Sequence, residues 1–216
     1  MKNYVKIINI IDKSGSMKEM LDAAINGYNE FTMDQKRVDG NALTTTVLFS
    51  SSSRYNILYE DVNIVDSYLL TKENYVPDGM TALYDAIGNT INREIDKLGD
   101  LAPEDRPDKI LCVILTDGKE NDSKKFNKDQ IKKLINEMRD EFKWEFIFLG
   151  ADENASLTAE TMGISRGNSY SFVQGSDGLR DAYAGISYAT KSYRMSKSAR
   201  LDNLMSDYEE EKKKDE

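Results

Sequence analysis

The chain of 216 residues contains no histidine, a single cysteine and only three prolines. The absence of histidine excludes a histidine-based catalytic triad, histidine general acid–base catalysis and the usual zinc sites. The one cysteine, Cys112, lies inside an apolar run and cannot form an intrachain disulfide, so nothing indicates an oxidising compartment. We interpret Cys112 as a small buried hydrophobic side chain.

The chain also lacks an excess of basic residues, because 29 Lys and Arg face 38 Asp and Glu, for a net charge of −9. Nucleic acids and anionic membranes bind basic surfaces, so we expect neither of them as a partner. No apolar run is long enough to span a membrane. The first apolar run contains Asn9 and ends at Asp12, which is unlike a signal peptide, so a cytoplasmic location is expected.

The chain does contain short apolar runs that alternate with amphipathic segments. Strands are predicted at 5–11, 43–50, 55–59, 110–115, 146–149 and 170–173. Apolar residues at helical spacing predict helices near 20–31, 81–98, 131–142, 152–162 and 179–193. Strands that alternate with helices form a parallel sheet with both faces covered. We therefore predict an α/β fold with a doubly wound, mostly parallel central sheet and helices on both faces.

One strand is expected to be antiparallel to the others. A turn at residues 51–53 connects the second and third predicted strands, and so short a connection joins antiparallel neighbours. The third strand then forms an edge of the sheet, and the continuously apolar run 110–115 forms its centre. Segment 62–76 has no clean period, so we expect it to be rich in loops.

A single domain is predicted to span residues 1–193. The remaining residues, 194–216, are polar and charged and finish in the sequence EEEKKKDE. We expect this C-terminal tail to be helical or disordered, since little in it could be buried in a core.

Polar residues follow the first strand and the central strand at the point where each ends. Asp12 closes the first strand and is followed by Ser14, Gly15 and Ser16, while Asp117 closes the central strand. Ligands of open α/β sheets bind at the carboxyl ends of strands, where the strand order reverses. If these two strands are neighbours, the two carboxylates meet in one crevice. Oxygen ligands of this kind suit a hard cation such as Mg²⁺.

Three short motifs resemble the metal-ion-dependent adhesion site (MIDAS) of von Willebrand factor type A (VWA) domains. They are DKSGS at 12–16, GMT at 79–81 and TDG at 116–118. The order of motifs and predicted elements agrees with that family from about residue 4 to residue 193, including the antiparallel edge strand. The pattern is most similar to the stand-alone intracellular VWA proteins of bacteria and their phages.

The resemblance implies a metal site formed by Asp12, Ser14, Ser16, Thr81 and Asp117. It implies that the two serine hydroxyls bind the cation directly, that Thr81 binds directly or through water, and that the two carboxylates act largely through water. The cofactor is expected to be Mg²⁺, with Mn²⁺ possible, and one coordination position stays open for a carboxylate of a protein partner. The resemblance thus implies a binding module and not an enzyme.

Other functions remain open from the residues alone. A Mg²⁺-dependent phosphoryl-transfer hydrolase of the haloacid dehalogenase type also starts with an aspartate at a strand end. Its signature needs a second aspartate where this chain has Ser14, and an acidic pair where it has only Asp117. A metal-independent scaffold protein is a further alternative, with the charged loop 119–125 and the tail as contact surfaces.

Each motif also has a simpler interpretation. Ser14 and Ser16 could cap the first helix, and Asp78 and Thr81 the next. The hydroxyls could also face a phosphate at a helix N-terminus. Two converging carboxylates oppose an anion by several kcal/mol at an effective dielectric of about 20. The basic residue Lys13 flanks the site, and the sequence does not fix where its side chain points.

Overall fold

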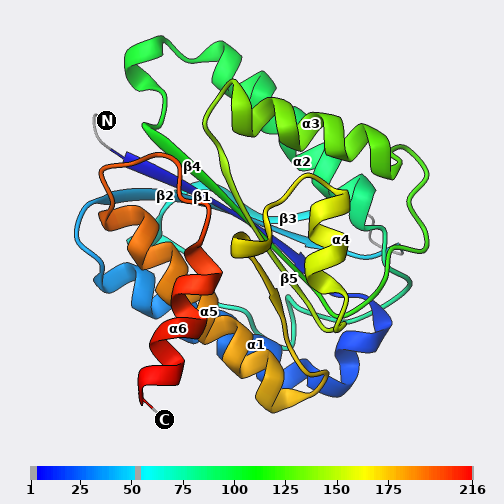
Figure 1. Cartoon of the computed structure of the whole chain (residues 1–216). Coiled ribbons are helices and arrows are strands. Elements are labelled where there is room, and N and C mark those ends of the chain that lie inside the picture. Colours follow the sequence, from blue (N-terminus) through cyan, green and yellow to red (C-terminus); the bar gives the residue numbers. More distant parts are fainter. Residues whose placement is uncertain (1–3, 52–54, 216) are drawn as a thin grey trace.

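A six-stranded sheet with the strand order β3-β2-β1-β4-β5-β6 forms the centre of the computed structural model, which describes residues 4–51 and 55–215 (Figure 1). The strands are β1 (Tyr4–Asp12), β2 (Asn41–Phe49), β3 (Asn56–Asn63), β4 (Lys109–Thr116), β5 (Glu145–Gly150) and β6 (Ser169–Ser171). Every neighbouring pair is parallel except β2 and β3. The predicted fold class and its antiparallel edge strand are therefore confirmed.

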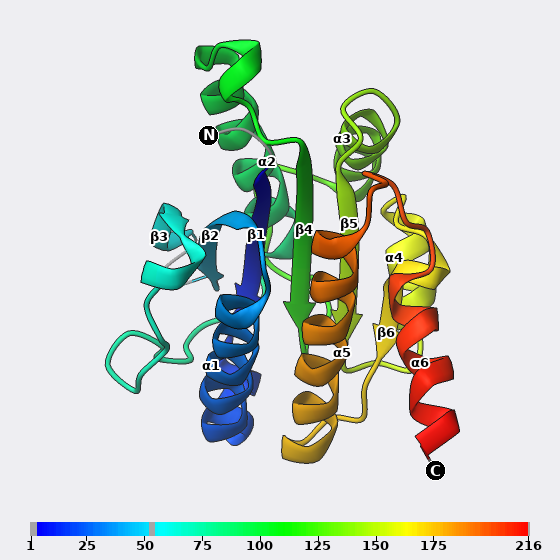
Figure 2. The ribbon, with the colours of Figure 1, turned by 90° about the vertical axis from the view of Figure 1, so that its left-hand side faces the viewer.

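Helices cover both faces of the sheet, as predicted (Figures 1 and 2). One face carries α1 (Leu21–Arg37), α5 (Ser176–Met195) and α6 (Leu204–Asp215), whereas α2 (Leu83–Asp100), α3 (Lys128–Asp140) and α4 (Ala155–Thr161) pack on the other. The short 3₁₀ helices are η1 (Gly15–Met20), η2 (Ile64–Asp66), η3 (Pro103–Asp105) and η4 (Arg166–Asn168). Among the described residues, no helix is long and apolar enough to cross a membrane.

The two faces of the central strands supply two separate apolar cores. Ile7 and Ile11 of β1 pack beneath α1 and α5, while Ile8 and Ile10 between them pack beneath α2 and α3. This alternation follows from the strand geometry, since successive side chains point to opposite faces. A strand covered on both faces is apolar throughout, which is why residues 110–115 were identifiable as the central strand.

The segment between β3 and α2 is more ordered than its irregular sequence suggests. Strand β3 continues to Asn63, and the chain then passes through η2 into a stretch without regular secondary structure that includes a turn at 72–74. The side chain of Asn29 in α1 holds this stretch by donating to the Leu70 carbonyl and accepting from the Leu70 N–H, at 3.0 and 2.8 Å. Such single side-chain contacts leave no periodic pattern in a sequence. Most of the predicted turn at 51–53 lies outside the described residues.

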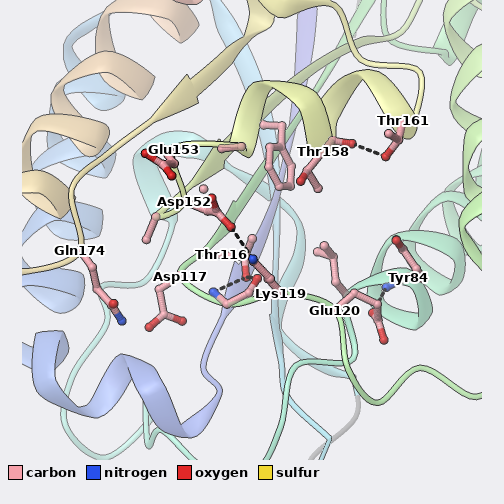
Figure 3. Close-up of a pocket in the computed structure, with 16 residues that line it drawn as sticks. Tyr84, Thr116, Asp117, Lys119, Glu120, Asp152, Glu153, Thr158, Thr161 and Gln174 are labelled. Atoms are coloured by element: carbon pink, nitrogen blue, oxygen red, sulfur yellow. Dashed lines mark hydrogen bonds and ion pairs between the residues drawn. The ribbon is translucent and has the colours of Figure 1, made fainter.

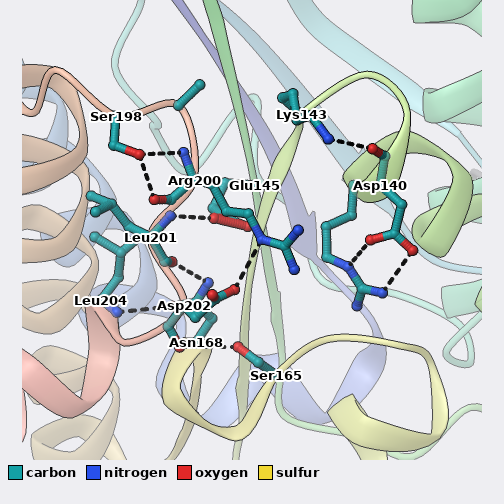
Figure 4. A network of polar contacts seen from close by, with 12 residues as sticks. Asp140, Lys143, Glu145, Ser165, Asn168, Ser198, Arg200, Leu201, Asp202 and Leu204 are labelled. Atoms are coloured by element: carbon teal, nitrogen blue, oxygen red, sulfur yellow. Dashed lines mark hydrogen bonds and ion pairs between the residues drawn. The ribbon is translucent and has the colours of Figure 1, made fainter.

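The segment between α5 and α6 passes the start of β5 and the end of η4, where polar side chains hold it (Figure 4). The Leu201 N–H donates to Glu145 Oε2 at 2.7 Å, and the Asn168 side chain bonds both the Leu201 carbonyl and the Leu204 N–H. In α6, Leu204 and Met205 are buried in the core shared with α1 and α5, whereas the residues that follow are mostly exposed. The first turn of α6 is therefore packed into the body of the molecule.

Candidate metal centre

The sheet places the carboxyl ends of β1 and β4 side by side. The two strands pair in parallel, with Ile11 opposite Leu115, so that Asp12 lies next to Thr116. The chain leaves these two strands toward opposite edges of the sheet, which makes this the point of reversal in strand order. The structure thus meets the condition on which the sequence interpretation depended, and a ligand crevice at this position is typical of open α/β sheets.

Asp12 is fully buried beneath the crevice and is held from three directions. Its Oδ1 accepts a hydrogen bond from the Ser14 N–H at 2.6 Å, and its Oδ2 accepts one from the Thr116 hydroxyl at 2.6 Å. The Tyr75 hydroxyl donates to the Asp12 carbonyl at 2.6 Å. These bonds fix the carboxylate of Asp12 before any ligand arrives.

Burial raises the pKa of Asp12 to about 7. The hydrogen bonds from Thr116 and Ser14 lower this pKa, and the nearby charge of Asp117 raises it. Burial likewise raises the pKa of Asp117, while its bond from Ser16 lowers that pKa. Both carboxylates therefore lie where an ionised oxygen is costly unless a positive charge accompanies it.

Three hydroxyl groups gather above these carboxylates. The Ser14 and Ser16 Oγ atoms lie 3.2 Å apart, and the Ser16 hydroxyl donates to Asp117 Oδ1 at 2.7 Å. A Cβ atom built on Gly118 would lie 2.8 Å from Thr81 Oγ1 and 3.8 Å from Ser16 Oγ. The structure thus brings the side chains of all five predicted site residues to one place, although they come from three distant segments.

One atom of this cluster is left without a partner. Asp117 Oδ2 is buried and accepts no hydrogen bond among the described residues, although the Gln174 side chain lies near enough to lower the pKa of Asp117. Buried polar oxygens are almost always satisfied, so an orphaned carboxylate oxygen beside three hydroxyls marks a place suited to a cation. No group of three or more His, Cys, Asp or Glu suited to a metal occurs in the described part of the chain. A cation here would therefore depend on hydroxyl oxygens and water, and this set of oxygens fits Mg²⁺.

Lys13 points to the far side of the loop. Its Nζ donates to Asp78 Oδ1 at 2.9 Å and to the Val76 carbonyl at 3.1 Å, and the side chain is almost fully buried. The Ser50 hydroxyl donates to the same Asp78 oxygen at 2.6 Å. The positive charge of Lys13 is thus paired with Asp78, which answers the question of orientation that the sequence left open.

The helix-capping interpretation is not what the structure shows for Ser14 or Thr81. Ser14 occupies the N-cap position of η1, but its side chain makes no capping hydrogen bond, and the N-cap of α2 is Ala82. The N-terminus of α2 is instead satisfied from the loop after β4, where Glu120 accepts from the Tyr84 N–H at 2.9 Å. The hydroxyls of the site are left to face one another and Asp117.

Sequence reasoning missed three residues that support the site. Thr116, within the third motif, holds Asp12 directly. Tyr75 lies in the segment without a period, and nothing in the sequence marked it as a partner of Asp12. Asn121 lies in the charged loop after β4 and bonds the backbone of Thr81. A contact between a side chain and a distant backbone group has no local signature that a single sequence could reveal.

A cleft of about 540 Å³ opens beside the candidate metal centre, over the carboxyl ends of β4 and β5 (Figure 3). Asp117 and Gln174 lie at one side of it, and Tyr84 with Glu120 lies at the other. Lys119 pairs with Asp152 at 3.1 Å within the cleft. The surface next to the candidate metal centre is thus hollow and largely acidic.

Comparison of the fold with solved structures finds VWA proteins. The chain is similar to proximal thread matrix protein 1 from the mussel byssus, described with a zinc-occupied MIDAS motif, at 14% identity and a TM-score of 0.59. It is similar to a von Willebrand factor type A protein from Catenulispora acidiphila, at 16% identity and a TM-score of 0.56. It is also similar to the pilus adhesin SpaC from Lactobacillus rhamnosus GG in its open conformation, at 14% identity and a TM-score of 0.64.

These matches cover most of this chain and a smaller part of the other proteins. They span 88%, 88% and 89% of this chain, and 46%, 43% and 30% of the three proteins in the same order. At such low identity the similarity establishes a VWA-like fold. No protein-family model matches the sequence, and no curated protein matches it either.

Proposed function

We propose that this chain is a protein-interaction module whose contact depends on a divalent cation. Asp12, Ser14, Ser16, Thr81 and Asp117 would hold Mg²⁺, or alternatively Mn²⁺. The bound cation would supply positive charge and one coordination position open to a carboxylate of a protein partner. The observation that carries the proposal is the buried, unpartnered Asp117 Oδ2 beside three convergent hydroxyls.

Two further facts support a binding role. The site offers hydroxyls and fixed carboxylates but no histidine, and Asp12 is locked in place by three hydrogen bonds. A nucleophile needs a neighbouring base and freedom to reach its substrate. Among the structurally similar proteins, one is described as a pilus adhesin and one as having a metal-occupied MIDAS motif. We extend a binding role without catalysis to this chain. We also propose that the protein is cytoplasmic.

The proposal is tested by capture of partners from a lysate with the purified chain as bait, in Mg²⁺ and in EDTA. The same experiment is run in Mg²⁺ with the variant Ser14→Ala, which removes one hydroxyl from the site. A partner retained only by the wild-type chain and only in Mg²⁺ supports the proposal. Partners retained equally in EDTA would favour the metal-independent scaffold. Hydrolysis of a generic phosphate ester that disappears in Asp12→Asn would replace the proposal with an enzyme.

Binding of the cation itself is expected to stabilise the folded chain. The unfolded chain scatters the five ligands, so Mg²⁺ binds the native state and adds RT ln(1 + [Mg²⁺]/Kd), about 2.7 kcal/mol at a hundredfold excess over Kd. Each kcal/mol raises the Tm of a domain of this size by about 2–4 °C. Calorimetric scans in Mg²⁺ and in EDTA measure the shift. A Tm that does not respond to millimolar Mg²⁺ would restrict Kd to the millimolar range or weaker.

A further inference from the structure

The backbone of Thr81 is bound by the loop that follows β4, and one side chain, that of Asn121, takes part. The Thr81 N–H donates to Asn121 Oδ1 at 2.9 Å, and the Asn121 N–H donates back to the Thr81 carbonyl at 3.1 Å. The Asp122 N–H reaches the same carbonyl at 3.3 Å. Both backbone polar groups of Thr81 are thus bound by consecutive residues of the loop that follows β4.

This loop also contains Asp117, four residues before Asn121. The loop is rigid in its own right, because Glu120 Oε1 accepts from the Asp122 and Ser123 N–H groups at 3.0 and 2.7 Å. Asp85 in the first turn of α2 accepts from three further N–H groups of the loop, those of Lys124, Lys125 and Phe126. The separation between Thr81 and Asp117 is therefore set by a bonded loop and not by the two side chains themselves.

The other side of the Thr81 loop is fastened to the first motif. The Gly15 N–H donates to the Gly79 carbonyl at 2.9 Å, and the Asp78 N–H donates to the Lys13 carbonyl at 2.9 Å. Gly79 has a φ of 66°, a left-handed conformation that glycine adopts without strain. Ser51 holds the next residue, since the Met80 N–H donates to Ser51 Oγ at 2.6 Å and the Ser51 N–H donates to the Met80 carbonyl at 2.7 Å. These bonds orient the residues before Thr81 but do not reach Thr81. Asn121 supplies the contact at Thr81 itself.

We propose that Asn121 is a positioning residue for the cation, because it holds the Thr81 hydroxyl at a fixed place relative to Asp117. This inference rests on the proposed metal site and deepens it. Mg²⁺ requires near-ideal octahedral geometry, so its affinity is sensitive to a displaced ligand. Residues that orient metal ligands typically change affinity by about 10–100-fold when they are removed. Asn121 is exposed, so its replacement leaves the cores intact.

The test is titration calorimetry of the full chain with Mg²⁺, using Asn121→Ala and Asn121→Asp. The alanine variant frees the Thr81 N–H and is expected to bind Mg²⁺ about 10–100-fold more weakly. The aspartate variant keeps an oxygen that accepts from the Thr81 N–H, so it is expected to bind with an affinity close to that of the wild type.

A matched control separates positioning from general loosening. Asn127 lies farther along the same segment and caps α3 through the Gln130 N–H, so its removal should destabilise the fold without touching the metal centre. Asn127→Ala is expected to lower the Tm in EDTA while leaving the Mg²⁺ affinity unchanged. If Asn121→Ala behaves in the same way, Asn121 is only structural and the inference is overturned. If the wild-type chain binds no Mg²⁺, both the proposed function and this inference fail.

Discussion

Asp117 is the residue at which a structural role and a metal-binding role can be separated. Burial raises its pKa, one of its oxygens has no partner in the described structure, and its charge adds to that of Asp12. In Asp117→Asn, the amide oxygen can still accept from the Ser16 hydroxyl, but the negative charge is gone.

We expect Asp117→Asn to be as stable as the wild type in EDTA, or slightly more stable, and to lose its response to Mg²⁺. The reason is that the metal-free site contains two repelling carboxylates, and the substitution removes one of them. Thermal unfolding of both chains in EDTA and in Mg²⁺ measures the two effects together. A strongly destabilised variant in EDTA would show that Asp117 mainly holds the fold.

Asp12 gives the site a pH dependence of definite sign. Its pKa in the folded chain is raised to about 7, so the side chain takes up a proton as the pH falls below 7. A proton and Mg²⁺ compete for the same carboxylate, so the affinity for Mg²⁺ decreases as the pH falls. For one displaced proton, we expect Kd for Mg²⁺ to be about tenfold higher at pH 6 than at pH 8.

Titration calorimetry at pH 6, 7 and 8 measures this change in Kd. The stability of the metal-free chain is a second measure, and it is expected to change with pH in the opposite direction to the Mg²⁺ affinity. Because the folded pKa lies above the unfolded one, Asp12 contributes stability that is complete below about pH 4 and is lost as the pH rises through 7. A Kd that is constant across this range would mean that Asp12 stays ionised throughout. The hydrogen bonds from Ser14 and Thr116 would then offset the effect of burial on its pKa.

At the scale of elements, β5 and the segment before α6 meet at a buried carboxyl group (Figure 4). Glu145 opens β5, is 2% exposed and accepts from the Leu201 N–H. Burial raises its pKa to about 7, the Leu201 bond lowers this pKa, and the charge of Asp202 raises it. A raised pKa means that Glu145 contributes stability below about pH 4.5, and that this contribution is lost as the pH rises through 7.

Glu145→Gln keeps an oxygen for the Leu201 N–H but cannot ionise. We expect the variant to be about 1–2 kcal/mol more stable than the wild type at pH 8 and nearly equal to it at pH 5. Urea unfolding in EDTA at the two pH values measures the difference. The exposed Glu141, changed to Gln, serves as the control for the loss of a surface carboxylate and should leave the stability nearly unchanged. A variant that is less stable at both pH values would mean that the ionised carboxylate is preferred in the fold.

The elements show what the sequence could and could not predict. Central strands buried on both faces and helices with one apolar stripe have recognisable patterns, so the fold class was predictable. The pairing of β1 with β4 was only a condition at the sequence level, because apolar patterns do not specify which strands are neighbours. The motifs placed all five site residues in three loops, and the structure brings these loops together. Tyr75 and Asn121 were missed because each contacts a distant backbone group through one side chain. The extension of β3 beyond residue 59 was missed because its bulge breaks the alternation of side chains.

At the scale of the whole molecule, the extent of the folded domain is open to a direct test. Residues 1–193 were predicted as the domain, whereas α6 buries Leu204 and Met205 in the core beneath α5. A chain that ends at Met195 would expose that part of the core and leave the Glu145 and Asn168 side chains without their partners beyond α5. We expect it to lose about 3–6 kcal/mol, at about 1.5–3 kcal/mol for each buried side chain.

The control is a chain that ends at Tyr208. It keeps the packed turn of α6 and loses only the charged end, including the Lys212–Asp181 pair, which is partly exposed and contributes little. Denaturant unfolding of the three chains ranks their stabilities. A chain of 1–195 that is as stable as the full chain would place the domain boundary at the end of α5.

The three loops of the metal centre also bear on the order of events in folding. The hydrogen bonds that join Asp12 to Thr116 and Ser16 to Asp117 connect residues 104 and 101 positions apart. Contacts so distant in sequence close large loops, and the entropy of closure makes them slow to form. A cation can bind only after these loops have met, so it adds nothing to the rate at which the chain folds. The cation instead slows unfolding, so the metal-bound domain stays folded for longer than the metal-free domain.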